Sequence, residues 1–390
     1  MKEWKKIKLG DVLTAVDYGT ASKSDANGKY PVLRMGNLEN GYLVWDDLVY
    51  TSSEEEYAKY ELNKGDILFN RTNSRDKVGK TSIYRGERQA IFAGYLVRLK
   101  VNKECDPFYI NYCLNSKEFA DFCRSVRTDA IGQSNINAQV LQTYSFLLPP
   151  LEEQKKIAET LSVWDDAIEK TEKLIALKET EYQANVSALI FENRKFAQKC
   201  KIGDVLEIRN IRATATDDRP LYSLTIEDGV TPKSERYDRL ALVKDKDSKK
   251  YKVVCDGDIV FNPANLRWGA IARANLDRDV VVSPIYEVLY VKGKEFDAKY
   301  ISQYLTSEKM ISYYATKTEG TLIERKEVKL DAFLQIDIYV EKNIENQIKI
   351  ADILDSAKKE INLLKQQLGN YKKQKQGLMQ KLLTGQWRVK

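Results

Sequence analysis

Two stretches of the chain carry apolar residues at alternating spacings of four and three, which is the pattern of a coiled-coil seam. The first begins after Pro149 and Pro150 and reaches about Phe191, and the second ends near Leu382. Each predicts a helix of about 40 residues, and at about 1.5 Å per residue such a helix is about 60 Å long. The predicted seam positions are Ile157, Leu161, Trp164 and Ile168 in the first stretch and Ile350, Leu354, Ile361, Leu364, Leu368, Leu378 and Leu382 in the second.

A long helix with an apolar seam needs a partner in water. A domain of about 145 residues is only about 30 Å across, so it cannot cover a helix of this length. We therefore expect the two helices to pair with each other as an antiparallel coiled coil, with pseudo-twofold symmetry between the two halves of the chain. The alternatives are that each helix packs on its own domain or against a second protein.

The sequence before each long helix predicts a mixed α/β (α+β) domain. Short β-rich runs such as Gly65–Asn70 and Tyr95–Val101 are separated by turns rich in glycine, Asn and Asp. Residues Phe108–Arg124 and Ala298–Thr316 have the pattern of amphipathic helices, which we expect to pack on the sheet.

The same motifs occur twice along the chain. KLGDVL at Lys8–Leu13 returns as KIGDVL at Lys201–Leu206, 193 residues later. GDILFN returns as GDIVFN after 192 residues, and EQKKIAETL returns as NQIKIADIL after 193. Because the chain has 390 residues, two copies fill it, and this long period indicates two tandem domains rather than a solenoid. The C-terminal LLTGQW leads back toward the N-terminal EWKKIKLGD, so we expect the two termini to lie close together.

Composition narrows the possible chemistry. The chain has 63 Lys and Arg against 57 Asp and Glu, an excess that permits a polyanionic partner but does not require one. It has no histidine, which is the commonest general base and metal ligand. Five cysteines without a CxxC pair predict free thiols in a reducing cytoplasm. The N-terminal MKEWKKIKLGD lacks the apolar run of a signal peptide, and no stretch has the length of a membrane span, so we expect a soluble, cytoplasmic protein with no membrane partner.

No motif predicts a catalytic or metal site. The sequence has no Walker A loop and no GxGxxG. FNPANL at Phe261–Leu266 is weakly similar to the [DN]PP[FY] loop of amino-methyltransferases, but it lacks the second proline and the aromatic residue, and no glycine-rich cofactor loop precedes it. Asp66 and Asp258 recur in the two GD[IV] motifs, and we interpret them as turn residues that bond their own backbone rather than as metal ligands.

Two polar segments in each copy are candidates for binding nucleic acid. Arg and Lys neutralise phosphates, and Arg and Asn also make bidentate contacts with guanine and adenine. An ordinary surface loop is the alternative for each segment, but recurrence at matching places in both copies favours a functional role. The candidates are Arg71, Asn73, Arg75, Lys77, Lys80, Arg127, Gln133, Ser134 and Asn135 in the first copy and Asn265, Arg267, Trp268, Lys317, Thr321, Arg325 and Lys326 in the second.

Four motifs give the chain a resemblance to a known family. They are W-x-x-x-x-L-G-D (Trp4–Asp11), K-G-D-I-L-F-N-R (Lys64–Arg71), L-P-P-L-E-E-Q-K-K-I-A (Leu148–Ala158) and L-M-Q-K-L-L-T-G (Leu378–Gly385). With them the chain resembles, over essentially its whole length, the specificity subunit of type I restriction–modification systems. One departure is VEKNIENQ (Val340–Gln347), where the family usually has a PPLxEQ-like segment. The second helix should still form, but its cap and its contact with one modification subunit are open to question.

The resemblance implies a target recognition domain at 1–148, a spacer helix at 149–192, a second target recognition domain at 193–341 and a second spacer helix at 342–390. The two recognition domains would read a bipartite, asymmetric target in double-stranded DNA with an unspecified gap. The spacer helices would dock two modification subunits, which carry S-adenosylmethionine and methylate adenine N6. Restriction subunits, which use ATP with Mg, would translocate and cleave DNA. The chain itself would bind no cofactor or metal and would have no catalytic activity.

Two alternatives stay open. The subunit could serve a related system that only methylates or that cuts on both sides of its target, because the nuclease lies on another chain. A different class of function is a coiled-coil adaptor or structural protein whose globular halves bind protein. DNA binding that depends on sequence and falls steeply with salt, measured with the modification subunit present, distinguishes a DNA reader from an adaptor.

Overall fold

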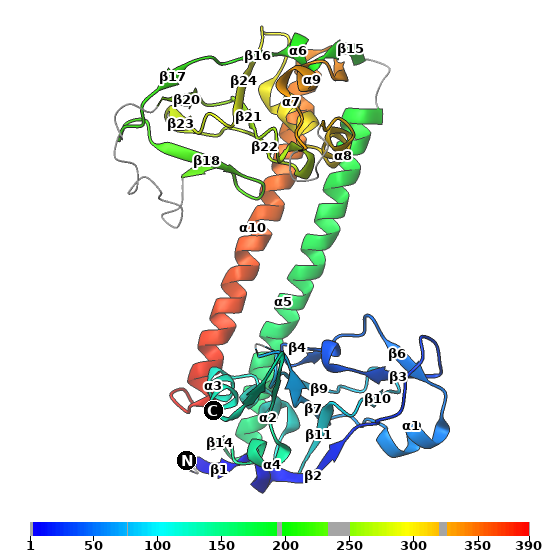
Figure 1. Cartoon of the computed structure of the whole chain (residues 1–390). Coiled ribbons are helices and arrows are strands. Elements are labelled where there is room, and N and C mark those ends of the chain that lie inside the picture. Colours follow the sequence, from blue (N-terminus) through cyan, green and yellow to red (C-terminus); the bar gives the residue numbers. More distant parts are fainter. Residues whose placement is uncertain (1–2, 76, 193–196, 233–249, 320–325, 390) are drawn as a thin grey trace. The chain divides into compact units, whose positions relative to one another are not determined.

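The computed structural model describes residues 3–75, 77–192, 197–232, 250–319 and 326–389. The chain separates into two compact units, Met1–Glu172 with Gln366–Lys390, and Lys173–Lys365. Each unit holds one globular domain and a part of each long helix (Figure 1). The boundary between the two units cuts through both long helices, whereas the sequence predicts four regions with each long helix as a region of its own. The division into four regions therefore remains a prediction.

The first domain is built on several small β-sheets. The four-stranded sheet is antiparallel, in the order β2-β11-β7-β9, with β2 (Leu13–Tyr18), β7 (Ile67–Asn70), β9 (Thr81–Ile83) and β11 (Leu96–Val101). A three-stranded sheet contains β3 (Tyr30–Leu33), β6 (Val49–Thr51) and β10 (Ile91–Phe92), and the short strands β4 (Leu38–Glu39) and β5 (Tyr42–Leu43) pair with each other. Strand β1 (Lys5–Lys8) pairs with β14 (Ser145–Leu148), so the first and last strands of the domain are neighbours. The strands predicted at Gly65–Asn70 and Tyr95–Val101 are β7 and β11.

The second domain repeats the four-stranded sheet in the same order. Its strands run β16-β24-β21-β22, with β16 (Leu206–Ile208), β21 (Ile259–Phe261), β22 (Ile271–Arg273) and β24 (Glu287–Val291). The other sheet differs, because it has five strands: β17 (Arg212–Ala213), β18 (Leu221–Thr225), β19 (Gly229–Pro232), β20 (Tyr251–Val254) and β23 (Val280–Val282). Strand β15 (Ala197–Lys201) pairs with β25 (Asp337–Glu341), as β1 pairs with β14 in the first domain.

The helix predicted in each domain is split in two. Phe108–Arg124 forms α2 (Pro107–Cys113) and α3 (Lys117–Val126), and Ala298–Thr316 forms α7 (Ala298–Leu305) and α8 (Glu308–Thr316). A serine side chain starts the second helix in each pair: Ser116 accepts from the backbone of Phe119, and Ser307 from that of Met310. Each serine starts a new helix, so one continuous helix does not form. The spacing of apolar residues does not reveal these N-caps. Short helices α1 (Glu54–Tyr60), α4 (Ala138–Leu141), α6 (Ile202–Val205) and α9 (Leu330–Leu334) complete the two domains.

The long helices are α5 (Leu151–Val186), continued by a π-helical turn at Ser187–Glu192, and α10 (Ile344–Leu383). In the first unit, Trp164 packs at right angles on Tyr371 with ring centres 5.9 Å apart, and Glu172 pairs with Lys372 at 2.6 Å. In the second unit, Glu179 pairs with Lys365 at 2.7 Å. Higher numbers in α5 meet lower numbers in α10, so the predicted antiparallel pairing is confirmed. No helix in the described residues is long and apolar enough to cross a membrane.

The seam residues do not all face the opposite helix. Every predicted seam residue is buried or half-buried, but the first turns of each helix also belong to a domain core. Ile157 and Leu161 pack in the first core together with Leu382, from the end of α10. Ile350 and Leu354 pack in the second core, which also takes up the end of α5. Each core therefore combines the start of one long helix with the end of the other, and the two packing schemes predicted as alternatives coexist.

Equivalent glutamines attach each long helix to its domain. The Gln154 side chain accepts from the backbone N–H of Asp106 at 2.8 Å, and the Gln347 side chain accepts from that of Asp297 at 2.8 Å. Asp106 and Asp297 in turn are the N-caps of α2 and α7. The side chain of Gln347 also donates to the Glu341 carbonyl at 2.7 Å. The recurring glutamine of the EEQ and ENQ motifs is therefore a buried structural residue that fixes two helix starts.

The second long helix begins without prolines but with a side-chain cap. The Asn343 side-chain oxygen accepts from the backbone N–H groups of Glu345 at 2.8 Å and Asn346 at 3.3 Å. In α5 the equivalent N–H of Glu153 donates instead to the carbonyl of Pro150 at 2.9 Å. An Asn cap thus takes the place of the proline turn, so the second long helix is capped although VEKNIENQ lacks the prolines.

The two ends of the chain meet on Glu153 within the first unit. The Arg388 guanidinium donates to both carboxylate oxygens of Glu153, at 2.6 and 2.7 Å, and the Trp4 indole donates to it at 3.1 Å. Gly385 has a φ of 72°, and a side chain there would come within 3.3 Å of the Trp4 ring. The termini lie close together, as the circular relation between LLTGQW and EWKKIKLGD predicts.

Candidate nucleic-acid interface

The structure joins the two polar segments of the first copy into one surface. Residues from both segments form a three-stranded antiparallel sheet, in the order β12-β13-β8, with β8 (Thr72–Asn73), β12 (Thr128–Ala130) and β13 (Gln133–Asn135). Ser134 lies opposite Asn73, and Asn135 lies opposite Thr72. Segments more than 50 residues apart are thereby held side by side, and no pattern in the sequence predicts this strand pairing.

A network around Asp129 holds this sheet together. Arg75 donates to the Asp129 carboxylate twice, at 2.9 and 2.7 Å, and the Ser134 hydroxyl donates to it at 2.5 Å. The Arg127 guanidinium lies 3.2 Å from the same carboxylate. The hydroxyl of Ser134 and the guanidinium of Arg75 hold the pKa of Asp129 below its usual value. Asp129, which was not among the predicted site residues, organises three residues that were.

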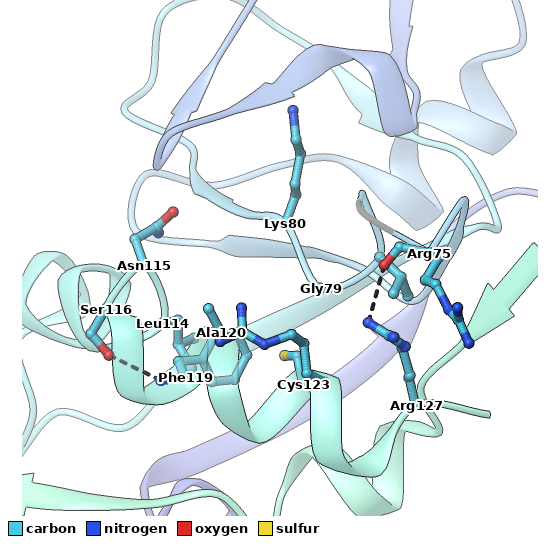
Figure 2. Close-up of a pocket in the computed structure, with 12 residues that line it drawn as sticks. Arg75, Gly79, Lys80, Leu114, Asn115, Ser116, Phe119, Ala120, Cys123 and Arg127 are labelled. Atoms are coloured by element: carbon cyan, nitrogen blue, oxygen red, sulfur yellow. Dashed lines mark hydrogen bonds between the residues drawn. The ribbon is translucent and has the colours of Figure 1, made fainter. Parts of the chain in front are cut away.

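A hollow of about 300 Å³ adjoins this network (Figure 2). Its lining includes Arg75, Lys80 and Arg127, together with Cys123 on α3. Burial raises the pKa of Cys123 to about 12, so this thiol stays protonated and unreactive at neutral pH. The Lys80 ammonium lies 3.7 Å from Glu39, a loose contact at the surface. The cationic side chains on its rim favour an anionic ligand.

The remaining first-copy candidates lie on or beside the same surface. The Arg71 guanidinium stacks over the Tyr18 ring, 5.0 Å from its centre. Asn73 accepts from the backbone of Ser74 at 2.8 Å, and Asn135 donates to the Thr72 hydroxyl at 3.0 Å. Lys77 and Gln133 are exposed. Only part of this set therefore has side chains available to a ligand, and the rest shape the surface.

Fewer of the second-copy candidates fall within the described residues. Thr321 and Arg325 lie outside them. Arg267 and Trp268 belong to a short 3₁₀ helix, η7 (Leu266–Trp268), with the guanidinium 4.0 Å from the indole centre. The Trp268 side chain is 57% exposed, although large aromatic side chains are usually covered.

The other second-copy candidates surround η7. Asn265 directly precedes η7. Lys317 directly follows α8, which packs against η7. Lys326 is next to Glu327, whose backbone pairs with that of Glu319. The structure thus brings Arg267, Trp268 and Lys317 onto adjoining elements, in the same relation as the first-copy loop has to α3.

A left-handed glycine closes the polar loop in both copies. Gly79 has a φ of 92° and Gly269 a φ of 91°. A β-carbon would come within 2.9 Å of the Cys123 sulfur at Gly79 and 3.1 Å of Ile311 at Gly269. Cys123 lies on α3 and Ile311 on α8, so in each domain the glycine lets the loop pack directly on the second helix. The sequence shows these glycines, but spacing alone did not single them out.

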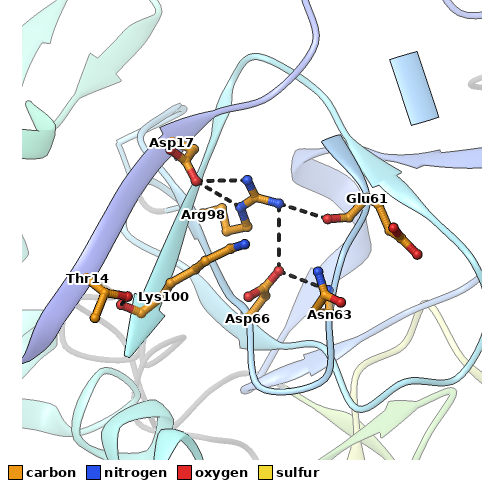
Figure 3. Close-up of polar contacts among 7 residues, drawn as sticks. All are labelled: Thr14, Asp17, Glu61, Asn63, Asp66, Arg98 and Lys100. Atoms are coloured by element: carbon orange, nitrogen blue, oxygen red, sulfur yellow. Dashed lines mark hydrogen bonds and ion pairs between the residues drawn. The ribbon is translucent and has the colours of Figure 1, made fainter. Parts of the chain in front are cut away.

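The recurring aspartates of the GD[IV] motifs are turn residues paired with arginine. Asp66 accepts from the backbone of Asn63 at 2.9 Å and lies 3.8 Å from Arg98 (Figure 3). Asp258 accepts from the backbone of Cys255 at 2.8 Å and from Arg209 at 2.5 and 2.8 Å. Burial raises the pKa of both carboxyls, and the turn hydrogen bond and the arginine oppose that rise. The described residues contain no cluster of three or more His, Cys, Asp or Glu side chains that could hold a metal ion.

The long helices expose apolar side chains outside the seam. Val163 and Leu177 on α5 are 67% and 69% exposed, and Leu363 on α10 is 65% exposed. Exposed apolar residues are common on protein surfaces, but burial of each of these side chains by a partner would be favourable.

Comparison with known proteins finds similarities in sequence and in fold. Residues 1–179 match the family described as type I restriction modification DNA specificity domain. A putative type I restriction enzyme MjaX specificity subunit from Methanocaldococcus jannaschii is 26% identical over 100% of this chain and 95% of its own length. The EcoKI specificity subunit from Escherichia coli strain K12 is 28% identical over 43% of this chain and 38% of its own. The crystal structure of a type I restriction–modification S subunit from M. genitalium is similar in fold, with a TM-score of 0.63, 14% identity and coverage of 98% of this chain and 96% of that one.

Proposed function

We propose that this chain is the specificity subunit of a type I restriction–modification system, and that each of its globular domains reads one part of a bipartite, asymmetric DNA target. The observation that carries this proposal is the surface of the first domain, where two distant segments unite cationic and amide side chains around Asp129. In support, Arg267 and Trp268 lie on η7 and Lys317 lies at the C-terminal end of α8, at matching positions along the second copy. Equivalent places with different side chains suit two half-sites of different sequence.

We further infer that this chain supplies recognition and assembly, while partner chains supply catalysis. The partners expected for this family are two modification subunits, which use S-adenosylmethionine to methylate adenine N6, and restriction subunits that use ATP with Mg. The exposed apolar residues Val163, Leu177 and Leu363 are separate candidates for contacts with the modification subunits. Val163→Asp should reduce co-purification with the modification subunit, whereas the exposed control Lys170→Ala should not.

Mapping methylated adenines tests the recognition role directly. The chain is expressed with its modification subunits in a host without adenine methylation at the target, and the modified sites are sequenced. Two defined half-sites separated by a fixed gap support the proposal. Arg75→Ala with Arg127→Ala should weaken only one half-site, because it releases the hairpin held by Asp129. Arg267→Ala with Trp268→Ala should weaken only the other, with a loss of about 1–3 kcal/mol for each base contact removed. Lys103→Ala, an exposed charge outside the surface, is the control.

The alternative functions predict other results. A coiled-coil adaptor would bind DNA weakly and without sequence preference even with the modification subunits present. A steep fall in affinity with salt, together with a preference for one sequence, excludes that reading. Whether the system restricts, methylates only or cuts on both sides depends on the partner chains, and purification of the assembly from its host identifies them.

The gap between half-sites offers a second test. We propose that the long helices set this gap, because α5 and α10 each contribute to both units. One heptad inserted after Leu174, with a second after Leu368 to keep the seam in register, adds about 10 Å of helix. The preferred gap should then lengthen by about three base pairs, at about 3.4 Å each. An unchanged gap with normal methylation would show that the helices do not act as a ruler.

A further inference from the structure

The hairpin β12–β13 has two chemically distinct faces. Asp129 and Ser134 lie opposite each other and point into the arginine network, where Ser134 is only 2% exposed. The flanking pairs, Thr128 with Asn135 and Ala130 with Gln133, occupy the other face because side chains alternate along a strand. Thr128, Ala130 and Gln133 are exposed. One face therefore anchors the hairpin, and the other presents small and amide side chains to solvent.

The tip of the hairpin is apolar and open. Ile131 and Gly132 connect the strands, and Gly132 has a φ of 75°, a conformation that favours glycine. The Ile131 side chain is fully exposed, at 106%, and a β-carbon at Gly132 would meet nothing within 4 Å. Within the described part of the chain, the Gln133 amide makes no hydrogen bond. A β-branched apolar residue at the end of a firmly anchored hairpin gains nothing from that position in the free protein.

Positive charge surrounds the base of the hairpin. Arg75 and Arg127 hold the inner face through Asp129, and Lys77 lies exposed on the adjoining loop. Cations placed beside the strands can contact the phosphates that flank a groove, while the strands themselves enter it. The network also fixes the hairpin before binding, which lowers the ordering cost.

The two-stranded form and the side chains of this hairpin suit the major groove of DNA. That groove is about 12 Å wide and admits a two-stranded ribbon. A glutamine amide can bond the N6 and N7 atoms of adenine together, and methyl groups can contact the thymine methyl. We infer that the outer face of β12–β13 enters the major groove, that Gln133 reads an adenine and that Ile131 contacts a thymine methyl group. This inference rests on the proposed function of the first domain and assigns the residues that determine its base preference.

Base-modified DNA tests the two contacts separately. Duplexes carrying the mapped target are bound by the complex of this chain with its modification subunits. Replacing one adenine of the first half-site by 7-deazaadenine removes N7 and should weaken binding by the wild-type complex about 10-fold, with no further effect on Gln133→Ala. Replacing a thymine by uracil removes the methyl and should weaken the wild type several-fold but not Ile131→Ser.

A change of specificity gives the stronger result. Gln133→Glu should lose the preference for adenine and gain one for cytosine, because a carboxylate accepts from cytosine N4. Gln139→Ala, an exposed glutamine on α4 outside the hairpin, is the matched control and should leave every base preference unchanged. Binding to the second half-site should be the same in all variants, which shows that they are folded and assembled.

The outcomes separate this inference from the proposed function. If the wild-type complex binds its target but Gln133→Ala and Ile131→Ser keep the same base preference and the same response to modified bases, the groove assignment is wrong and the DNA-reading function stands. If the wild-type complex shows no sequence preference at all, the proposed function itself fails. The assignment is also overturned if DNA binding is weakened only by base analogues altered in the minor groove and does not respond to 7-deazaadenine.

Discussion

Asp66 and Asp258 occupy the same turn in the two domains, yet their arginine partners come from different strands. Arg98 belongs to β11, whereas Arg209 directly follows β16. The position equivalent to Arg98 in the second domain is Val288, because Arg98 lies opposite Leu68 and Val288 opposite Val260 in corresponding registers. The requirement that persists is a positive charge beside a buried carboxylate, and either strand can supply it. A scaffold contact can therefore be kept while its residues change.

The candidate reading surfaces differ more freely than the scaffold does. The first domain carries a hairpin braced by Asp129, and the second carries a stacked pair of Arg267 and Trp268 on η7. In each domain the surface depends on an equivalent left-handed glycine, which packs on the second helix of that domain. The comparison indicates that the common fold fixes where a loop lies, and that exposed side chains fix what it binds.

The largest expected effect comes from removing the arginine of the second domain. Asp258 is 1% exposed and has a bidentate partner in Arg209, whereas Arg98 is 3.8 Å from Asp66 and closer to the half-exposed Asp17, at 2.8 Å. Arg209→Met should destabilise the second domain by about 3–5 kcal/mol, because it leaves a buried carboxylate unpaired. Arg98→Met should cost the first domain less. Hydrogen exchange of β21 and β7 during urea titration measures the two domains separately.

The control is the double variant Arg209→Met with Asp258→Asn, which should recover most of the loss. The pH dependence has a definite sign. Burial already raises the pKa of Asp258, and loss of Arg209 raises it further, so the folded variant binds its proton more tightly than the unfolded chain. The stability deficit of the variant relative to the wild type should therefore shrink as the pH falls from 7 toward about 4, the usual range of an Asp carboxyl. A deficit that stays constant between pH 7 and pH 5 would contradict the buried-charge explanation.

The starts of the two long helices provide the next comparison. Glu153 binds Arg388 and Trp4, whereas Asn346 at the equivalent place is exposed. Glu153→Gln should destabilise the first unit by about 1.5–3 kcal/mol, the usual range for hydrogen bonds to a charged group. Asn346→Ala should change the free energy of unfolding by less than about 0.5 kcal/mol. Urea unfolding measures both, and protease cleavage after Arg388 should become faster in Glu153→Gln only.

The effect of Glu153 also depends on pH. The bonds from Arg388 lower the pKa of Glu153 below its usual value, so the stabilisation is present above that value and is lost as the pH falls through the folded pKa. The difference between wild type and Glu153→Gln should therefore shrink toward pH 3. If the difference is as large at pH 3 as at pH 7, shape rather than charge accounts for the effect.

The two left-handed glycines test whether the loops are equivalent. Gly79→Ala and Gly269→Ala should each cost about 1–2 kcal/mol for the left-handed conformation. Gly79→Ala should cost more, since its β-carbon would lie 2.9 Å from Cys123, against 3.1 Å from Ile311 at Gly269. Cys123→Ala should relieve the extra cost in the first domain and leave the conformational part. Equal losses without relief by Cys123→Ala would show that conformation alone matters.

The sequence predicts some parts of this structure better than others, for physical reasons. Both long helices and their seam are predictable, because the contacts repeat locally every seven residues. The turn roles of Asp66 and Asp258 are also predictable, because the hydrogen bond in each turn joins residues only three positions apart. The sheet β12-β13-β8 is not, because Asn73 and Ser134 are distant in sequence and their strands are short and polar. The arginine partners of the aspartates were missed because they depend on strand neighbours.

The smallest effect concerns the cap of α10. Asn343→Ala removes the side-chain oxygen that binds Glu345 and Asn346, and should cost about 1 kcal/mol, or about 2–4 °C in the melting temperature of a unit of this size. Asn343→Asp keeps the acceptor and should be nearly neutral. In the first unit the acceptor at the start of α5 is the backbone carbonyl of Pro150, which Pro150→Ala keeps. Pro150→Ala should therefore not lose a hydrogen bond at the helix start. If Asn343→Ala leaves the melting temperature unchanged, the buried hydrogen bonds of Gln347 hold the start of α10 without a cap. In that case Gln347→Ala should destabilise the second unit more than Gln154→Ala destabilises the first.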